Sequence, residues 1–316
     1  MRHNLSRDMI VIGASAGGVE ALQQVVADLT PDLPAALFVT THLSPRSVSF
    51  LPEILSRSGP LPASHPMNGS PIRTGHIYVA PPDRHLLVHQ DRIELSMGPK
   101  ENRHRPAVNA LFRSAAIAYG PRVVGVVLTG ALDDGTAGLW DIKQRGGKAI
   151  VQDPKDARYP DMPRHALEQV PIDHVTTLRG LAPLLTDIVG QPVLIEAHTK
   201  GEPMTDVRRT ALTCPDCRGP ISEVRQGPIT EYACRVGHRY SPVTFLAAYE
   251  ETRERALWAT VVALEEGAEV AQELAAHSTS EVQRLLEQEA KSNGRVAGKI
   301  RELLTSLIRK ETEHVM

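Results

Sequence analysis

Three residues that lie far apart in the chain are of the types that form a nucleophile, its base and an orienting acid: Ser15, His42 and Asp134. Each follows a short apolar run with strand character, and these runs are 9–12, 36–41 and 123–128. Because the carboxyl ends of parallel strands meet along one edge of an α/β sheet, the three side chains are expected to converge there. Ser15 would then attack a carbonyl carbon, His42 would take its proton, and Asp134 would hold the imidazole in the right tautomer.

The serine lies in a turn of small residues, Gly13-Ala14-Ser15-Ala16-Gly17-Gly18. Such residues allow a sharp strand-to-helix turn that exposes the hydroxyl, and the N–H of Ala16 beside the following helix is predicted to bind the oxyanion. Two alternatives remain open, because a serine here can simply cap the helix and glycine-rich turns also bind dinucleotide phosphates. However, serine replaces the middle glycine of the dinucleotide fingerprint, and no acidic residue follows the strand at 36–41.

The region up to about residue 195 alternates short apolar runs with amphipathic stretches. The strands expected from this pattern are 9–12, 37–41, 123–129, 148–152 and 174–177. The helices expected between them are 19–28, 106–118, 136–145 and 163–168. This alternation predicts an α/β fold with a doubly wound, mostly parallel sheet. Residues 76–95 instead alternate apolar and polar positions around turn residues, which predicts antiparallel hairpins that are inserted into the domain or lie at the edge of that sheet.

The overall composition excludes several classes of protein. The 316 residues carry a formal net charge of −2, which gives no general attraction to nucleic acid or anionic membranes. No apolar run reaches the ~20 residues that span a bilayer, and the N-terminal residues contain no apolar signal segment. The three cysteines are too few for a disulfide framework and fit a reducing compartment. These features predict a cytoplasmic protein that neither binds nucleic acid nor inserts into a membrane.

The cysteines lie together in a short stretch near residue 225. Cys214 and Cys217 form one chelating turn, and Cys234 and His238 form a second after sixteen intervening residues, 218–233. Two such turns can close a tetrahedral site of the zinc-ribbon kind, so these four residues are predicted to bind a structural zinc ion. A redox dithiol would leave Cys234 and His238 without a role. No cofactor is expected for catalysis.

Four parts are expected along the chain: 1–195, 196–212, 213–241 and 242–316. They are an α/β catalytic domain, a polar linker, a zinc-ribbon-like module and a helical hairpin. The last part has two apolar stripes at helical spacing, separated by a polar turn at 275–281. Such stripes bury themselves against each other, against the main domain or against a second copy of the chain, so a homo-oligomer through these helices is one expected outcome.

Several separate segments resemble the catalytic domain of the chemotaxis protein-glutamate methylesterases, the CheB family. The segments are 11–18, 41–44, 75–81, 103–108, 127–130, 134–135, 151–154 and 162–163. They occur in order across nearly the whole of residues 9–189, which makes the resemblance specific. In that family the residues that match Ser15, His42 and Asp134 are the catalytic triad. One departure is that the family's Gly-Met-Gly before the aspartate is Gly130-Ala131-Leu132 here.

The resemblance implies hydrolysis of a glutamate γ-methyl ester on a chemoreceptor or another signalling protein, with release of methanol, and glutamine deamidation as a second activity. The loop residues Arg46, Arg103 and Arg105 could meet acidic receptor helices. Only eight residues precede the first expected strand, so no phosphorylatable receiver domain is expected in front of it. A different class of function also remains open, in which an idle methylesterase-like domain acts as an adaptor and binds partners through the zinc module and helices.

Overall fold

The computed structural model describes residues 5–193 and 205–313. The chain divides into two compact units, Met1–Phe245 and Leu246–Met316. The first unit holds an α/β domain and the cysteine-containing module, and the second holds most of two long helices. The predicted division into four parts stays a prediction, and most of its linker, residues 196–204, lies outside the described residues.

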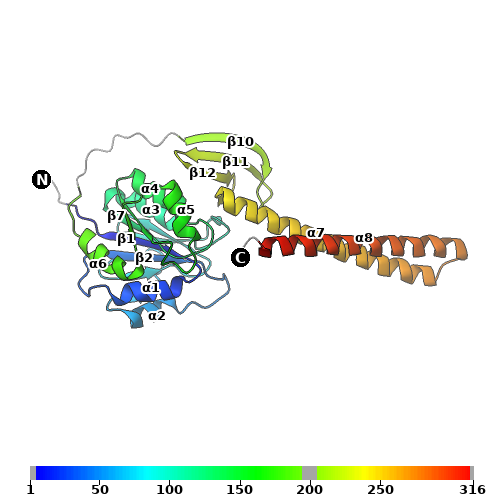
Figure 1. The fold of residues 1–316 in the computed structure, drawn as a ribbon, viewed down its shortest axis with the longest axis horizontal. Helices are drawn as coiled ribbons and strands as arrows, with labels where there is room; N and C mark the ends of the chain where they lie inside the picture. The colour runs from blue at the N-terminus through cyan, green and yellow to red at the C-terminus, as the bar shows by residue number, and fades with distance from the viewer. Residues whose placement is uncertain (1–4, 194–204, 314–316) are drawn as a thin grey trace. The chain divides into compact units, whose positions relative to one another are not determined.

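A seven-stranded parallel sheet forms the centre of the first unit (Figure 1). In order across the sheet, its strands are β3 (Ala63–Ser64), β4 (Ile77–Val79), β2 (Ala36–Thr41), β1 (Met9–Ala14), β7 (Val123–Val127), β8 (Lys148–Gln152) and β9 (His174–Thr176). The chain winds outward from β1 in one direction and then continues from β7 in the other. The order therefore reverses between β1 and β7, and open α/β sheets bind ligands at the carboxyl ends of the strands at such a point.

Six helices cover the two faces of this sheet. On one face lie α1 (Gly18–Ala27), α2 (Leu51–Ser58) and α6 (Leu178–Ile188), and on the other lie α3 (Val108–Tyr119), α4 (Thr136–Gln144) and α5 (Asp161–Gln169). Strands β1, β2 and β7 are buried at every position, because helices pack on both of their faces. The structure thus confirms the predicted doubly wound α/β fold.

One strand at the edge of the fold differs from the prediction. Residues 77–79 were expected in an antiparallel hairpin, but β4 pairs in parallel with both β2 and β3. The predicted antiparallel hairpin consists of β5 (His85–His89) and β6 (Arg92–Ser96), which form a separate two-stranded sheet, as an inserted hairpin would. Leu86, Val88 and Ile93 of this hairpin are buried in the cluster that contains α3, and this packing explains their alternating pattern.

The cysteine-containing module is a four-stranded antiparallel sheet of β10 (Thr205–Thr213), β11 (Pro220–Gln226), β12 (Ile229–Cys234) and β13 (Arg239–Tyr240). Most of β10 was expected to be linker. Nearly all of β10 is exposed, so it carries no alternating apolar signal. The turn between β11 and β12 lies against the α/β domain, because a Cβ on Gly227 would come within 2.6 Å of the Trp140 ring in α4.

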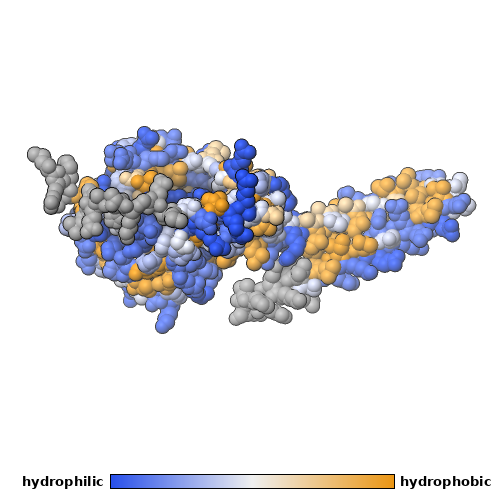
Figure 2. Space-filling view, turned by 90° about the horizontal axis from the view of Figure 1, so that it is seen from above, coloured by the Kyte–Doolittle hydropathy of each residue, from blue (hydrophilic) through white to orange (hydrophobic). Residues whose placement is uncertain are grey.

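The second unit contains the antiparallel pair expected from the sequence. The helices are α7 (Pro242–Ala276), whose first turn belongs to the first unit, and α8 (Ser280–Glu313). Val261 of α7 packs against Ala297 and Leu304 of α8. Other apolar side chains remain on the surface of this pair (Figure 2), including Trp258 and Leu303. Among the described residues, no helix has the length and apolar character needed to cross a membrane.

Candidate active site

The three residues singled out from the sequence lie in one hydrogen-bonded series at the carboxyl edge of the sheet. Ser15 follows β1, His42 follows β2, and Asp134 lies between β7 and α4. Ser15 Oγ is 2.9 Å from His42 Nδ1, and His42 Nε2 is 2.8 Å from Asp134 Oδ2. An ionised carboxylate can only accept a hydrogen bond, so the imidazole carries its proton on Nε2 and Nδ1 keeps a lone pair for the serine hydroxyl. The imidazole is thus in the tautomer that a general base requires.

Close packing shapes the turn that carries the serine. Gly17 has φ of 72°, a left-handed conformation that glycine adopts without strain, and it precedes the first residue of α1. A Cβ on Gly130 would lie 2.8 Å from Ser15 Cβ and 2.1 Å from Met162 Sδ, so only glycine fits beside the serine. Ser15 N–H donates to Thr129 O, whereas the Ala16 N–H donates to no protein acceptor in the described part of the chain. The Ala16 N–H is therefore available to a ligand.

Asp134 is the most buried member of the series, with 2% of its side chain exposed. Burial favours the neutral acid, but the hydrogen bond and charge of His42 and the N–H of Val108 outweigh it and lower the pKa of Asp134 to about 2. The N–H groups of Val108 and Asn109 at the start of α3 both donate to this carboxylate. The positive end of the helix thus keeps Asp134 ionised at every physiological pH.

Two functional neighbours of the triad were not predicted. The ring of His104 stacks on that of His42, with centroids 3.5 Å apart and planes inclined by 7°. Burial lowers the pKa of His104 to about 4, with repulsion from His42 acting in the same direction, so His104 is neutral near pH 7. Asn102 donates from Nδ2 to Asp134 Oδ1 at 3.1 Å. Both residues lie in the loop before α3, where the sequence has no periodic pattern. The segment 103–108, which resembles the CheB family, was the one sequence signal in this region.

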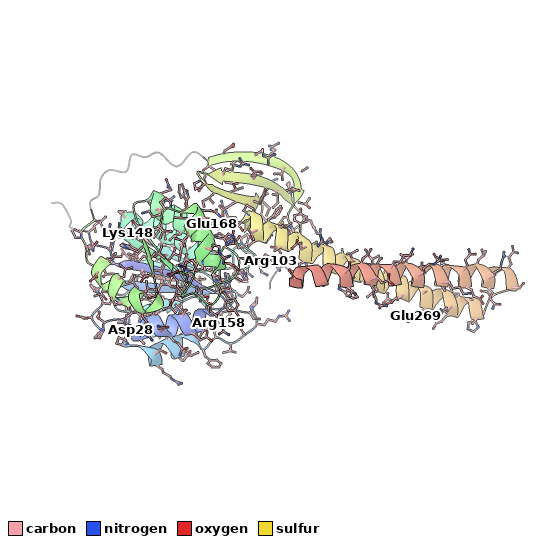
Figure 3. The ribbon with its side chains drawn as sticks, in the orientation of Figure 1. Asp28, Arg103, Lys148, Arg158, Glu168 and Glu269 are labelled. Atoms are coloured by element: carbon pink, nitrogen blue, oxygen red, sulfur yellow. The ribbon has the colours of Figure 1, made fainter. Side chains whose placement is uncertain are left out.

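The arginines expected to face a substrate differ in their surroundings. Arg105 is only 17% exposed and binds Asp83 and the carbonyl oxygens of Met97 and Gly98, so it is part of the loop structure rather than a free cation. Arg46 is exposed in the loop that follows His42. Arg158, which the sequence did not single out, lies between β8 and α5 with its side chain 69% exposed (Figure 3). Its Cβ comes within 3.4 Å of a Cβ built on Gly17, which places it beside the serine turn.

The predicted metal ligands also gather in space. One ligand atom from each of Cys214, Cys217, Cys234 and His238 lies within 4.8 Å of all the others. Cys217 Sγ is 3.7 Å from Cys234 Sγ, and His238 Nδ1 is 3.7 Å from Cys214 Sγ and 3.5 Å from Cys234 Sγ. With zinc–sulfur bonds of about 2.3 Å, the sulfur atoms of a tetrahedral site lie about 3.8 Å apart. The donor atoms therefore have the spacing of a closed four-ligand site.

A doubly wound α/β domain with a serine, a histidine and an aspartate in series at its switch point is the architecture of a serine hydrolase. Comparison with known proteins narrows this class. Residues 10–185 match the family model described as CheB methylesterase, which is more than half of the chain. The chain belongs to the CheB methylesterase family.

Individual relatives agree with this assignment. A relative from Leptospira interrogans is 36% identical over 181 residues, which are 57% of this chain and 94% of the relative. The protein-glutamate methylesterase/protein-glutamine glutaminase of Pectobacterium atrosepticum is 37% identical over 181 residues, 56% of this chain and 51% of that protein. The crystal structure of the Thermotoga maritima CheB methylesterase catalytic domain superposes with a TM-score of 0.56 at 29% identity and covers 58% of this chain and 100% of that domain. The similarity is thus concentrated in the α/β domain.

Proposed function

We propose that this chain is a serine-type protein-glutamate methylesterase that hydrolyses glutamate γ-methyl esters on a chemoreceptor or a related signalling protein. The observation that carries the proposal is the Ser15–His42–Asp134 series, with contacts of 2.9 and 2.8 Å, in a domain of the CheB methylesterase family. Glutamine deamidation follows the same chemistry, with ammonia in place of methanol as the leaving group. Relatives from several organisms carry both activities in their names.

The first half of the reaction forms a glutamyl-enzyme. Ser15 Oγ attacks the ester carbonyl carbon while its proton moves to His42 Nδ1. The tetrahedral oxyanion accepts a hydrogen bond from the Ala16 N–H, and one such donor is commonly worth about 3–4 kcal/mol in the transition state. The imidazolium is stabilised by Asp134, which stays ionised throughout. When the intermediate collapses, His42 Nδ1–H protonates the methoxide oxygen and methanol leaves.

The second half regenerates the enzyme. A water molecule attacks the acyl carbon of the glutamyl-enzyme while His42 Nδ1 takes one of its protons. The second oxyanion collapses with return of that proton to Ser15 Oγ, and the substrate leaves as a glutamate. No step needs a cofactor, since the triad supplies the nucleophile, the base and the acid.

Arg158 is our proposed contact for an acidic substrate surface. It lies beside the serine turn and is exposed, and its ion pair with Glu20 has a long N–O distance of 4.0 Å. An exposed pair of this kind contributes little to stability, so the guanidinium is available to a carboxylate of the substrate. Arg158→Ala should raise KM for methylated receptors with little change in kcat, whereas Arg164→Ala, an exposed arginine in α5, should leave both unchanged.

Methanol release from methylated chemoreceptors tests the proposed reaction. The wild type should release methanol, and Ser15→Ala should not. Ser306→Ala serves as a matched control, because Ser306 is exposed on α8 and its hydroxyl donates to the carbonyl oxygen of Leu303 in its own helix. Failure of the wild type on every methylated receptor would reject the proposed substrate.

A fluorophosphonate probe separates the esterase from the adaptor alternative. The probe reacts covalently with an activated serine, so Ser15 should be labelled and Ser15→Ala should remain unlabelled. The intact hydrogen-bonded series favours the esterase. A folded wild type that resists labelling would favour an adaptor that has kept only the fold.

We further propose that Cys214, Cys217, Cys234 and His238 bind a structural zinc ion. The spacing of the donor atoms supports a closed site, as does the position of these residues in or beside the turns that connect β10 to β11 and β12 to β13. A bound zinc ion would join the two chelating turns and contribute to the folding of the module. Elemental analysis of the purified protein should find about one zinc per chain, and Cys217→Ser together with Cys234→Ser should abolish it. Protein purified without metal, yet folded in this module, would reject the site.

A further inference from the structure

The active-site carboxylate contacts a residue that also binds the cysteine-containing module. Asn102, in the loop before α3, is 2% exposed and donates from Nδ2 to Asp134. Its side-chain oxygen Oδ1 accepts from Ser241 N–H at 2.9 Å and from Thr244 Oγ1–H at 2.8 Å. The amide of Asn102 therefore lies between Asp134 and the segment Arg239–Thr244, which directly follows His238.

The surrounding groups permit only one orientation of this amide. The backbone N–H of Ser241 can only donate, and the ionised carboxylate of Asp134 can only accept. A flipped amide would place its NH₂ group against that N–H and its oxygen against the carboxylate. Both clashes would be costly at a site this buried. The donors from Ser241 and Thr244 thus determine that Asn102 presents an N–H to Asp134.

The backbone of Asn102 is held by the same segment. Asn102 N–H donates to Arg239 O at 2.8 Å, and Glu101 pairs with Arg239 in a parallel β-bridge. Asn102 has φ of 48°, a left-handed conformation that asparagine adopts more readily than most residues. Main chain and side chain are therefore both fixed by residues that lie about 140 positions later in the sequence.

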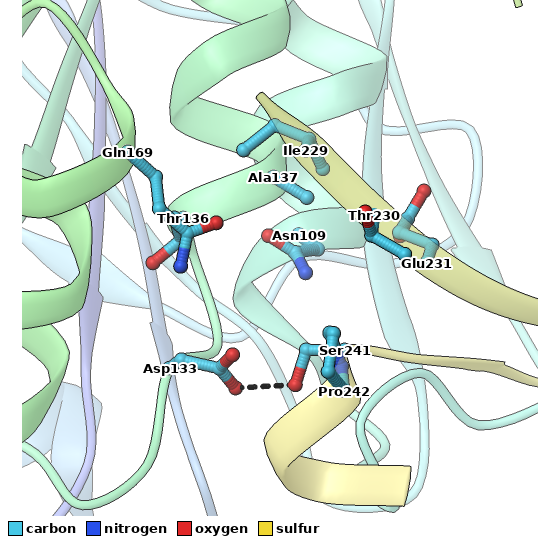
Figure 4. Close-up of a pocket in the computed structure, with 10 residues that line it drawn as sticks. All are labelled: Asn109, Asp133, Thr136, Ala137, Gln169, Ile229, Thr230, Glu231, Ser241 and Pro242. Carbon is cyan, nitrogen blue, oxygen red and sulfur yellow. Dashed lines mark hydrogen bonds between the residues drawn. The ribbon is translucent and has the colours of Figure 1, made fainter. Parts of the chain in front are cut away.

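Polar contacts anchor this segment and the neighbouring strand β12 on the α/β domain. Ser241 Oγ donates to Asp133 Oδ1 at 2.7 Å (Figure 4). Asp133 directly precedes the active-site residue Asp134 in the sequence. Arg113 of α3 binds Glu101 at 2.8 Å and Glu231 of β12 at 3.2 Å. These contacts hold the segment and β12 on the α/β domain, so the groups that bind Asn102 are fixed in place.

We propose that Asn102 is a positioning residue of the esterase and that the segment Arg239–Thr244 holds it in its working orientation. The inference rests on the proposed function of the Ser15 site. Besides His42, Asn102 is the only side-chain donor to Asp134 among the described residues, since the other donors are backbone N–H groups. Without this bond the carboxylate has freedom to turn, and His42 loses its alignment with Ser15.

Asn102→Asp isolates the donor. The aspartate keeps the size of the side chain and an oxygen for Ser241 and Thr244, but it places a second carboxylate oxygen against Asp134. We expect the rate of fluorophosphonate labelling and kcat to fall about 10- to 100-fold, the value of a hydrogen bond to a charged group, with KM unchanged. Asn102→Gly removes the amide and suits the positive φ, so it should show a similar loss if the aspartate variant fails to fold.

Thr244→Val tests whether the segment acts through Asn102. The substitution removes one of the two donors to Asn102 Oδ1 and should slow labelling about threefold to tenfold. In an Asn102→Gly background the same substitution should have no further effect, because the residue through which it acts is already absent. Thr260→Val is the matched control, since Thr260 is exposed on α7 and bonds only to Ala256 O.

The labelling rate needs no assumption about the natural substrate, so the outcomes separate the two proposals. Labelling of Asn102→Asp and Asn102→Gly at the wild-type rate would overturn the positioning role. Equal slowing by Thr244→Val in both backgrounds would overturn the role of the segment. A wild type that is labelled but releases no methanol would reject the substrate and leave the inference standing. A wild type that is not labelled would overturn the proposed function and the inference with it.

Discussion

Replacing Asp134 with asparagine tests both the geometry and the electrostatics of the active site. Both carboxylate oxygens accept only N–H donors, which come from His42, Asn102, Val108, Asn109 and Gly135. Oδ2 accepts two of these bonds and Oδ1 accepts three. An asparagine has one oxygen and one NH₂ group, so at least two donors would face another N–H. The substitution therefore changes the charge and leaves buried donors unpaired, with little change in shape.

The expected loss of unfolding free energy follows from the burial and the pKa of the Asp134 carboxylate. Lowering the pKa of Asp134 from its ordinary 3.8 to about 2 corresponds to about 2 kcal/mol in favour of the charged form. Each buried donor left unpaired adds about 1–3 kcal/mol. We therefore expect Asp134→Asn to lower the free energy of unfolding by about 4–8 kcal/mol. Labelling of Ser15 should slow by about 10⁴, because the amide stabilises the wrong tautomer of His42.

The same charge predicts a pH dependence. The pKa of Asp134 is lower in the folded protein than in the unfolded chain. Its stabilisation is therefore present above about pH 4 and is lost as the pH falls toward 2. The free energy of unfolding of the wild type should consequently decrease more steeply between pH 5 and pH 3 than that of Asp134→Asn.

Urea unfolding followed by the fluorescence of Trp140 reports on the α/β domain when Trp258 in the other unit is replaced by Phe. Ser15→Ala in this background is the matched control, since it should abolish labelling and leave the free energy of unfolding nearly unchanged. Labelling of Asp134→Asn within tenfold of the wild type, or an identical decrease in stability from pH 5 to pH 3, would refute the reasoning.

Three further substitutions probe the packing around the site. Gly130→Ala places a methyl group 2.1 Å from Met162 Sδ, so it should lower the free energy of unfolding by about 1–3 kcal/mol and slow labelling of Ser15. Gly298→Ala, in open space on α8, is the control and should leave stability unchanged or raise it. Equal effects of the two substitutions would contradict the close packing around Gly130. Arg113→Met leaves three carboxylates without their shared cation and should cost about 3 kcal/mol in urea unfolding, whereas a loss below about 1 kcal/mol would show that the cluster is not structural. Burial holds the pKa of His104 near 4, so this residue should not titrate between pH 5 and pH 8. His104→Phe should keep the stack on His42 and leave the shape of the pH–rate profile in this range unchanged. A shifted profile would show that His104 titrates there.

The sequence was most informative where burial leaves a strong signal. Strands β1, β2 and β7 are covered on both faces, so they appear as uninterrupted apolar runs whose ends mark the sheet edge. Ser15, His42 and Asp134 could be predicted together because each lies in the loop that follows one of these runs. The cysteine cluster could be predicted from spacing alone, since two short chelating turns need no knowledge of the rest of the fold.

Other features were missed for physical reasons. Strand β4 is three residues long and gives too little pattern to separate parallel from antiparallel pairing, and β10 is exposed and carries no alternation. Asn102 lies in a loop, and its partners at 241 and 244 are distant in the sequence. A polar side chain that works through tertiary hydrogen bonds has no periodic signature, so only coordinates reveal it.

The buried junction around Arg113 has a practical consequence for how the protein is handled in the laboratory. A recombinant fragment truncated near residue 195 would remove Glu231, the acceptor for one arm of that guanidinium, and would expose the oxygen of Asn102 to water. Turnover measured on such a fragment would be that of an enzyme in which Asn102, and through it Asp134, is held less firmly. The 316-residue chain, with the cysteine-containing module in place, is the appropriate reference when its activity is compared with that of relatives that consist mainly of the α/β domain.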